Sequence, residues 1–343
     1  MDINGISIDS NQDTKAQITH DYMLEEKETE FKVTVVTKDG KAQKSFMVFY
    51  GKKPKPSANS FQLISILELA NVDNVNSVPD NIAKKAATKA VLTVVPGYTI
   101  PMRETSLIKI RAILLREKYV KKDYSAKEIS YSQLSAAWLE KNTLLGEIFG
   151  GLGLNDVRTD NGSVLVGADE SAFETFFNTG LNQKLSKMSS WDLKWTYKLI
   201  DAKSDPADAD DNADGGAWSL KTGLKYKIIG LKTAGEITYT AKDAKGKYQD
   251  NSSTKFKVKL NFPMGSLTPS WEYAAKDKTM KIKDIRKGVT PNYKTNTITV
   301  KIGYKLSSSL RLGFSYQNKE NKSNVETAEF KASTIALSAM HIF

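Results

Sequence analysis

Residues Lys255 to Met264 read K-F-K-V-K-L-N-F-P-M. Every second side chain in this stretch is apolar, and lysine or asparagine fills most of the positions between. Successive side chains of a β-strand point to opposite faces, so the alternation predicts a strand with one apolar face and one cationic face. Such a strand belongs in a sheet that separates an apolar phase from water.

The same alternation recurs through the second half of the chain, from residue 191 to residue 343. Long polar connections and short turns follow each other in strict alternation between these candidate strands. In bacterial outer-membrane barrels, short turns lie on the periplasmic side and long loops lie outside. The pattern therefore predicts an all-β fold, a transmembrane antiparallel β-barrel. The candidate strands of this half are Trp191–Leu199, Trp218–Ile228, Leu231–Lys242, Lys255–Met264, Leu267–Tyr273, Ile298–Leu306, Leu310–Gln317 and Ile335–Phe343.

The first half alternates less regularly. Phe31, Val33 and Val35 alternate with polar residues, and Asp39-Gly40 is a hairpin signal before a return strand. With the return strand Phe46–Tyr50, the further candidates are Ser60–Leu69, Ala90–Ile100, Thr105–Arg116, Ile129–Leu139, Thr143–Phe149 and Ser163–Gly167. We expect about 16 strands, within a range of roughly 12 to 18. The whole chain, residues 1–343, is expected to form a single transmembrane β-barrel domain.

Two short helical insertions are predicted to interrupt the strands. The first is Ser77–Lys89, with Pro79 and Asp80 as its start signal, and the second is Glu170–Leu185, capped by Asp169. Five apolar side chains share a face of the second helix and predict a constriction or plug in the lumen, a lipid contact or a subunit contact. They are Phe173, Phe176, Phe177, Leu181 and Leu185.

Composition does not distinguish a membrane protein from a soluble one, because 40% apolar and 26% charged residues suit both classes. No window approaches 18 uncharged apolar residues, which argues against membrane-spanning helices. The alternative is a soluble β-sandwich with aromatic residues in its core. Strands of about ten residues are long for a sandwich, where about 5 to 6 residues are usual. The chain has no cysteine, which fits an oxidising envelope where unpaired thiols are a hazard. Met1-Asp2-Ile3-Asn4 lacks signal-peptide features, so either the protein is cytosolic or a signal peptide has been removed, and we expect the second.

The net charge of +11 comes largely from lysines that alternate with apolar residues. They neither cluster on a helix nor interleave with stacking aromatics, so no nucleic-acid partner is expected. On the polar face of a barrel they would form cationic rings that favour anions, although they would also serve simply to solvate a wide lumen. The predicted lumen-lining residues are Lys194, Lys198, Lys221, Lys225, Lys227, Lys255, Lys257, Lys259, Lys301, Lys305 and Arg311.

Aromatic residues are predicted to face lipid and to form two interfacial girdles. Near the long-loop ends we place Trp218, Tyr239, Trp271, Tyr273 and Tyr316, and near the short-turn ends Trp191, Tyr226, Tyr304 and Phe343. Phe256 belongs to the same lipid-facing set.

Catalytic and metal-binding motifs are weak. His20 and His341 lack a carboxylate or serine at motif spacing, so a Ser-His phospholipase-type site cannot be assembled and no enzyme is expected. Asp210, Asn212 and Asp214 match the opening of a calcium loop, but Lys221 stands where a bidentate glutamate belongs. A solvated loop is the simpler interpretation, with a loose divalent-cation site as the alternative. No cofactor is predicted.

The closing strand carries a more specific signal. Every second residue from Ile335 to Phe343 fits the terminal pattern favoured by the machinery that assembles outer-membrane proteins. In this respect the chain resembles the porin-like outer-membrane β-barrel family. The resemblance implies the outer membrane of a Gram-negative bacterium, a homo-oligomer, and membrane lipids and the barrel-assembly machinery as partners.

The lysine-rich, cysteine-free sequence is also similar to the porin-like outer-membrane proteins of predatory bacteria. That resemblance implies a ring-like oligomer whose apolar inner surfaces hold lipid, without an open pore. The leading hypothesis is a porin-like channel for small hydrophilic, preferentially anionic solutes. The alternatives are the lipid-enclosing oligomer and a structural or adhesive envelope protein.

Overall fold

The computed structural model describes the backbone at residues 2–3, 6–7, 29–37 and 40–48, and then residues 59–343. Within the latter range, residues 76, 80–81, 144, 160–171, 203–208, 229 and 285–287 lie outside the description, as do the side chains of residues 125–127, 142–143 and 159. Among the described residues, no helix is long and apolar enough to cross a membrane.

The chain divides into two units, Met1–Ser57 and Ala58–Phe343. The first unit holds a four-stranded sheet of order β2-β1-β3-β4. Its strands are β1 (Asp2–Ile3), β2 (Ile6–Ser7), β3 (Thr29–Thr37) and β4 (Gly40–Val48). The predicted hairpin around Asp39-Gly40 therefore exists as β3 and β4, but it is not part of the barrel wall. The single domain expected over residues 1–343 is corrected to two units.

The second unit is a closed antiparallel barrel of 14 strands. Its strands are β5 (Ser60–Val72), β6 (Ala87–Pro101), β7 (Ser106–Tyr119), β8 (Ile129–Thr143), β9 (Gly146–Thr159), β10 (Ala172–Lys184), β11 (Ser189–Ala202), β12 (Gly215–Ile228), β13 (Leu231–Ala244), β14 (Asn251–Asn261), β15 (Leu267–Met280), β16 (Asn292–Lys305), β17 (Leu310–Ser323) and β18 (Phe330–Ile342). Each strand pairs with its neighbour in sequence, and β18 pairs with β5 to close the ring.

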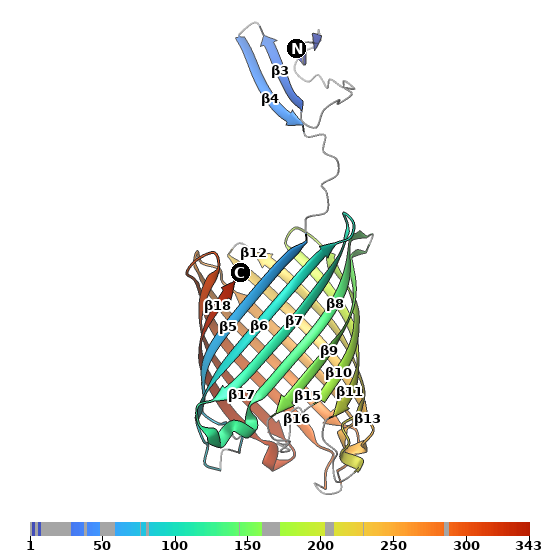
Figure 1. Cartoon of the computed structure of the whole chain (residues 1–343), viewed down its shortest axis with the longest axis vertical. Helices are drawn as coiled ribbons and strands as arrows, with labels where there is room; N and C mark the ends of the chain where they lie inside the picture. Colours follow the sequence, from blue (N-terminus) through green and yellow to red (C-terminus); the bar gives the residue numbers. More distant parts are fainter. Residues whose placement is uncertain are drawn as a thin grey trace. The chain divides into compact units, whose positions relative to one another are not determined.

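Connections alternate between the two ends of the barrel, as the sequence predicts. Short turns such as 102–105 and 306–309 join strands at one end, and longer loops such as 73–86 and 281–291 join them at the other. Among the described residues, short 3-10 helices occur only in long loops. In Figure 1 they gather at the end of the barrel opposite the carboxyl terminus. They are η1 (Lys122–Lys127), η2 (Ala209–Asp211), η3 (Lys247–Gln249) and η4 (Glu326–Ala328).

The two faces of the wall differ in chemistry and in crowding. Directly paired residues on neighbouring strands point to the same face, so the register assigns every strand residue to one side. Away from the strand ends, exposed large apolar side chains such as Leu92, Leu220 and Val300 lie on one face. Buried strand residues such as Asn155 and Phe176 lie on the other. Side chains converge inside a closed barrel and diverge outside it, so the crowded face is the lumen and the apolar exposed face is the exterior.

The strand number differs from the predicted 16 for identifiable reasons. Two predicted strands form the hairpin of the first unit, and the candidate Ser163–Gly167 lies outside the described residues. One real barrel strand, β10, was assigned to a helix. The result of 14 strands lies within the predicted range.

The predicted helix Glu170–Leu185 is wrong, because Ala172–Lys184 is strand β10, paired with β9 and β11 along its length. Phe173, Phe177 and Leu181 are four residues apart, and this spacing places side chains on one face of a helix and equally on one face of a strand. Phe176 distinguishes the two, since it faces the lumen while the other three face outward. Leu185 follows the strand in a short turn and is exposed.

The predicted helix Ser77–Lys89 is also wrong. Its last three residues begin strand β6, where Lys89 pairs with Ala70 of β5 and Tyr119 of β7. Ahead of the strand, Asn74 is only 1% exposed, and its amide binds the backbone of Val78 and the carbonyl of Lys331 at 2.8 Å. A buried asparagine that takes up backbone groups favours a turn over a helix.

The two-faced wall predicts opposite outcomes for charge at neighbouring positions of β16. Val300→Arg places a charge on the outer face near mid-strand and should cost roughly 2 to 4 kcal/mol of folding free energy. Thr297→Arg faces the lumen, where water solvates the guanidinium, and should change that free energy little. Urea unfolding in lipid vesicles measures both variants, and equal losses from the two would contradict the assigned faces.

Candidate functional site: the inner wall of the barrel

All of the predicted lumen cations occupy strand positions on the inner face. They come from β11, β12, β14, β16 and β17, so the cationic positions extend over much of one side of the ring. Their side chains reach solvent within it: the Lys225 side chain is 59% exposed and that of Lys198 is 38% exposed. This part of the inner wall is therefore a hydrated, lysine-rich surface.

Four of these lysines are held by carboxylates on neighbouring strands. Lys198 lies 2.7 Å from Glu174, and Lys221 lies 2.7 Å from Glu236. The pairs Lys225 with Asp192 and Lys257 with Glu272 are looser, at 3.3 and 3.2 Å. These pairs are partly exposed, so each contributes little to stability by itself. Their main effect is to neutralise part of the wall.

The other predicted cations have no ion pair within the described part of the chain. They are Lys194, Lys227, Lys255, Lys259, Lys301, Lys305 and Arg311. Several face another cation directly across a strand pair: Lys194 opposes Lys221, and Lys305 opposes Arg311. Like charges in direct opposition are destabilising unless water or counter-ions screen them. This arrangement leaves positive charge on the wall that no described carboxylate compensates.

The sequence alone missed further inner-face cations. They include Lys89, Lys109, Arg111, Lys184, Lys232, Lys276 and Lys278. Lys276 and Lys278 lie beyond the end of the predicted strand Leu267–Tyr273, but β15 continues to Met280 and carries both lysines on its inner face. The acidic residues at inner-face strand positions are fewer: Glu68, Glu117, Glu147, Glu174, Asp192, Glu236 and Glu272. The inner wall therefore carries a net positive charge.

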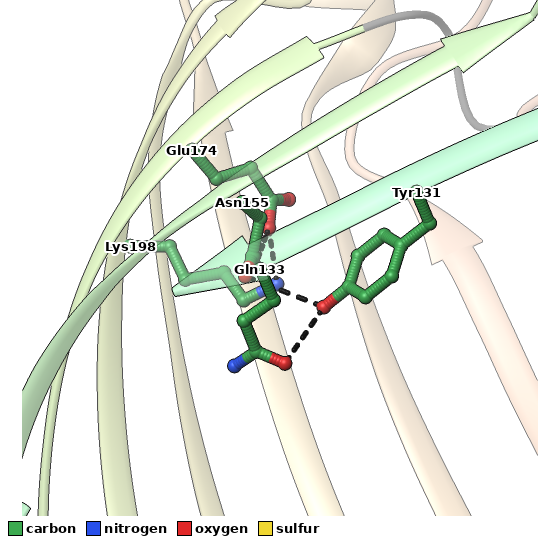
Figure 2. A network of polar contacts seen from close by, with 5 residues as sticks. All are labelled: Tyr131, Gln133, Asn155, Glu174 and Lys198. Carbon is green, nitrogen blue, oxygen red and sulfur yellow. Dashed lines mark hydrogen bonds and ion pairs between the residues drawn. The ribbon is translucent and has the colours of Figure 1, made fainter. Parts of the chain in front are cut away.

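A polar network crosses four strands near the long-loop end of the inner wall (Figure 2). Glu174 on β10 accepts hydrogen bonds from Lys198 on β11 at 2.7 Å and from Asn155 on β9 at 2.8 Å. Tyr131 on β8 donates toward Gln133 at 3.0 Å and lies 3.3 Å from the Asn155 amide oxygen. Asn155 is only 6% exposed, so the network satisfies a buried polar group.

Two phenylalanine rings lie against glycines of the inner wall. Phe176 covers Gly153, and Phe149 covers Gly180, and a methyl group on either glycine would overlap the ring. Glycine therefore gives these rings space beside the wall. Phe176 was predicted as part of a constriction, and its 7% exposure shows that it is packed among its neighbours.

The predicted lipid-facing aromatics occupy outer-face positions, and Phe343 follows the end of β18. Trp218 and Tyr239 form a pair with ring centroids 5.2 Å apart toward the long loops, and Trp191 donates to Thr222 at 2.8 Å near the short turns. The depth predicted for Trp271 is wrong. β15 continues to Met280, so Trp271 lies nearer the short turns, and Tyr273 and Tyr316 lie near mid-strand.

The calcium-loop candidate forms a set of contacts within the long loops. Asp210 pairs with Lys247 at 2.6 Å, and Asp214 pairs with Lys245 at 3.0 Å. Asn212 accepts a hydrogen bond from the Asp214 amide at 2.8 Å. Hydrogen bonds from Lys245 and from the Ala202 amide hold the pKa of Asp214 below its usual range. The described residues contain no group of three or more His, Asp or Glu that could hold a metal.

His341, predicted at the interface, lies on the outer face of β18 with its ring 4.1 Å from that of Phe343. Its Nδ1 is buried and has no hydrogen-bond partner among the described residues. His20 lies outside the described residues.

Known structures with a similar barrel are outer-membrane proteins. DcaP, an outer membrane channel of Acinetobacter baumannii, matches with a TM-score of 0.51 and 11% identity, over 83% of this chain and 97% of that chain. The chain has the fold of an outer-membrane channel. The anion-selective porin from Comamonas acidovorans matches with a TM-score of 0.49 and 11% identity, over 83% and 100% of the two chains. No protein-family model matches the sequence, and no curated protein matches it. Similarity at this level concerns the fold alone.

The polar network predicts a specific stability loss. Glu174→Ala leaves the buried Asn155 amide without its acceptor and should cost roughly 1 to 3 kcal/mol. Glu174→Gln keeps an acceptor oxygen without the charge, so it should cost less. Urea unfolding in vesicles ranks the two variants, and an unchanged midpoint for Glu174→Ala would show that the network does not stabilise the wall.

The Asp214 contacts predict an acid-dependent loop. A carboxyl group whose folded pKa is depressed adds stability above its unfolded pKa, and this stability is lost as the pH falls through the lower folded value. The Ala202 amide donates to Asp214 at 2.8 Å. Its protection against hydrogen exchange, relative to the intrinsic rate at each pH, should therefore fall below about pH 4. Asp214→Asn keeps an acceptor without a titrating group and should remove most of this acid dependence. An identical pH profile in the variant would assign the dependence to another group.

Proposed function

We propose that this protein is a porin-like channel of the outer membrane that passes small hydrophilic solutes and prefers anions. The observation that carries the proposal is the inner wall, where lysines outnumber carboxylates and several have no ion-pair partner in the described structure. Fixed positive charge along an aqueous path lowers the free energy of an anion in that path and raises that of a cation.

The wall itself supports placement in a membrane. Apolar side chains cover its outer face, including Leu152, Leu220 and Leu337, which are 64%, 44% and 61% exposed. A continuous apolar exterior needs lipid or a partner to cover it. The fold shared with DcaP is consistent with the outer membrane of a Gram-negative bacterium as its location. A homo-oligomer and assembly by the barrel-assembly machinery remain predictions of the sequence.

The hydration of the inner lysines favours a channel over a closed structural barrel. Lys225 and Lys198 are both substantially exposed although they lie inside the ring. A barrel that served only as an adhesive or structural scaffold would gain nothing from solvated charge on its inner wall. We assign no enzymatic reaction to the inner wall.

Ion selectivity tests this function. Lys255→Glu reverses an unpaired charge on the inner face and should reduce the chloride-over-potassium permeability ratio by at least about fivefold. A unit charge at about 4 Å in water is worth about 1 kcal/mol, and the reversal changes the free energies of chloride and potassium in opposite directions. Lys294→Glu makes the same change on the outer face of β16 and serves as the matched control. Reversal potentials in planar bilayers measure both. Folded protein that conducts no ions, or equal shifts from both variants, would contradict the proposal.

A further inference from the structure

The inner wall is not uniform around the ring. Six aliphatic residues on β5, β6 and β7 lie on the inner face. Five of them are partly exposed to the lumen, and the sixth, Val95, is buried with 8% of its surface exposed. The five are Ile64, Ile66, Val91, Ile113 and Leu115. Together these six residues form the aliphatic patch. The register joins them across the three strands, since Ile64 pairs with Val95 and Leu115 pairs with Thr93, which in turn pairs with Ile66.

The membrane does not explain the aliphatic patch. The outer faces of the same strands are already apolar, with Leu67, Leu92 and Leu114 exposed there. A water-filled lumen does not require a second apolar face, and apolar surface facing water is unfavourable by roughly 25 cal/mol per Å². The patch is therefore matched to something apolar inside the lumen.

Two cations border the patch on its own strand. Arg111 and Lys109 precede Ile113 in the sequence and lie on the inner face of β7, between Ile113 and the short turn at 102–105. Both are exposed. Arg111 pairs across the strands with Gly97 and Ser135, and Lys109 pairs with Thr99 and Ala137, so none of these neighbours is acidic. Gly97 has no side chain, which leaves the space beside Arg111 open. Neither cation forms an ion pair with a described residue.

The opposite side of the lumen is cationic at the same depth. In the closed order of 14 strands, β12, β13 and β14 lie seven strands away from β5, β6 and β7 respectively. Lys255 and Lys259, which form no ion pair with a described residue, lie on either side of the middle of β14, as Ile66 and Ile113 lie near the middle of β5 and β7. Lys221 and Lys257 lie at the same depth but are paired with Glu236 and Glu272. A solute that crosses the lumen therefore meets an aliphatic surface on one side and ammonium groups on the other.

We propose that the lumen selects aliphatic carboxylates, with the carboxylate bound by Arg111 and Lys109 and the hydrocarbon chain lying on the aliphatic patch. This inference rests on the proposed channel function and names its substrate class. A guanidinium binds a carboxylate through two parallel hydrogen bonds, which suits Arg111 to this role. The patch contains no aromatic side chain, which favours a flexible aliphatic chain over a stacked ring. An inorganic anion has no hydrocarbon chain and would gain no binding free energy from the aliphatic patch.

Block of chloride current in planar bilayers tests the proposal, with hexanoate as the probe. Hexanoate should interrupt the current at a concentration roughly tenfold lower than acetate, which lacks the chain, or hexanol, which lacks the charge. Arg111→Gln and Ile113→Asn should each abolish this difference. Lys301→Gln removes a lumen cation elsewhere in the ring and should leave it unchanged. Equal block by acetate and hexanoate, or block indifferent to Ile113→Asn, would overturn the proposal.

Calorimetry in nanodiscs separates this inference from the channel function, because it needs no conduction. Saturable hexanoate binding to the protein, lost in both variants, would support the site. If the same protein conducts no chloride, that result contradicts the channel function and leaves the binding site supported. If Ile113→Asn does not fold, as judged by heat-modifiable migration on gels, Ile66→Thr replaces it. Absence of hexanoate binding would overturn the proposal. Hexanoate binding that appears only after lipid is extracted from the protein would also overturn the proposal. That result would show that a lipid acyl chain occupies the aliphatic patch.

Discussion

The hydrogen-bonded seam between β18 and β5 closes the sheet, and the rest of the barrel depends on it. The seam runs from the pair Thr334 and Val72 to the pair Ile342 and Ile64, and the amide of Phe343 extends it to the carbonyl of Leu63 at 2.9 Å. Without this pairing, two strand edges would present free backbone groups to lipid, where each costs several kcal/mol. Closure removes those edges and also creates an inside and an outside. The lumen, with its cationic and apolar surfaces, therefore exists only because the ring is closed.

Once the ring is closed, the inner face is free to vary around its circumference while the outer face stays apolar. From β11 to β17 the inner face is rich in lysine, with like charges opposed at Lys194 and Lys221. From β5 to β7 it carries the aliphatic patch, bordered by Arg111. Between these regions, Glu174 connects β9, β10 and β11 through hydrogen bonds, and Tyr131 adds β8 through its contact with Asn155. The lumen therefore combines a hydrated cationic surface with an apolar one, which suits an anion that has an apolar chain.

The same variation explains which features the sequence could predict. Alternation from Trp191 onward revealed the strands and their faces, because one side faces lipid and the other faces water. β5 to β7 gave a weaker signal, since Ile113 and Leu114 are apolar on opposite faces. The spacing of Phe173 and Phe177 fits a helix and a strand equally, and only pairing with β9 and β11 decides between them. Arg111 could not be connected to Val95 before the register of β6 and β7 was known.

Cysteine scanning of β14 measures directly which face of the wall meets water and which meets lipid. The chain has no cysteine of its own, so each introduced thiol reports on one position. A charged, membrane-impermeant maleimide is applied to vesicles that contain Phe256→Cys, Lys257→Cys, Val258→Cys or Lys259→Cys. If one wall separates lipid from an aqueous lumen, the variants at Lys257 and Lys259 react and those at Phe256 and Val258 do not. Equal reactivity at all four positions, or reaction at Phe256 and Val258 alone, would contradict the account.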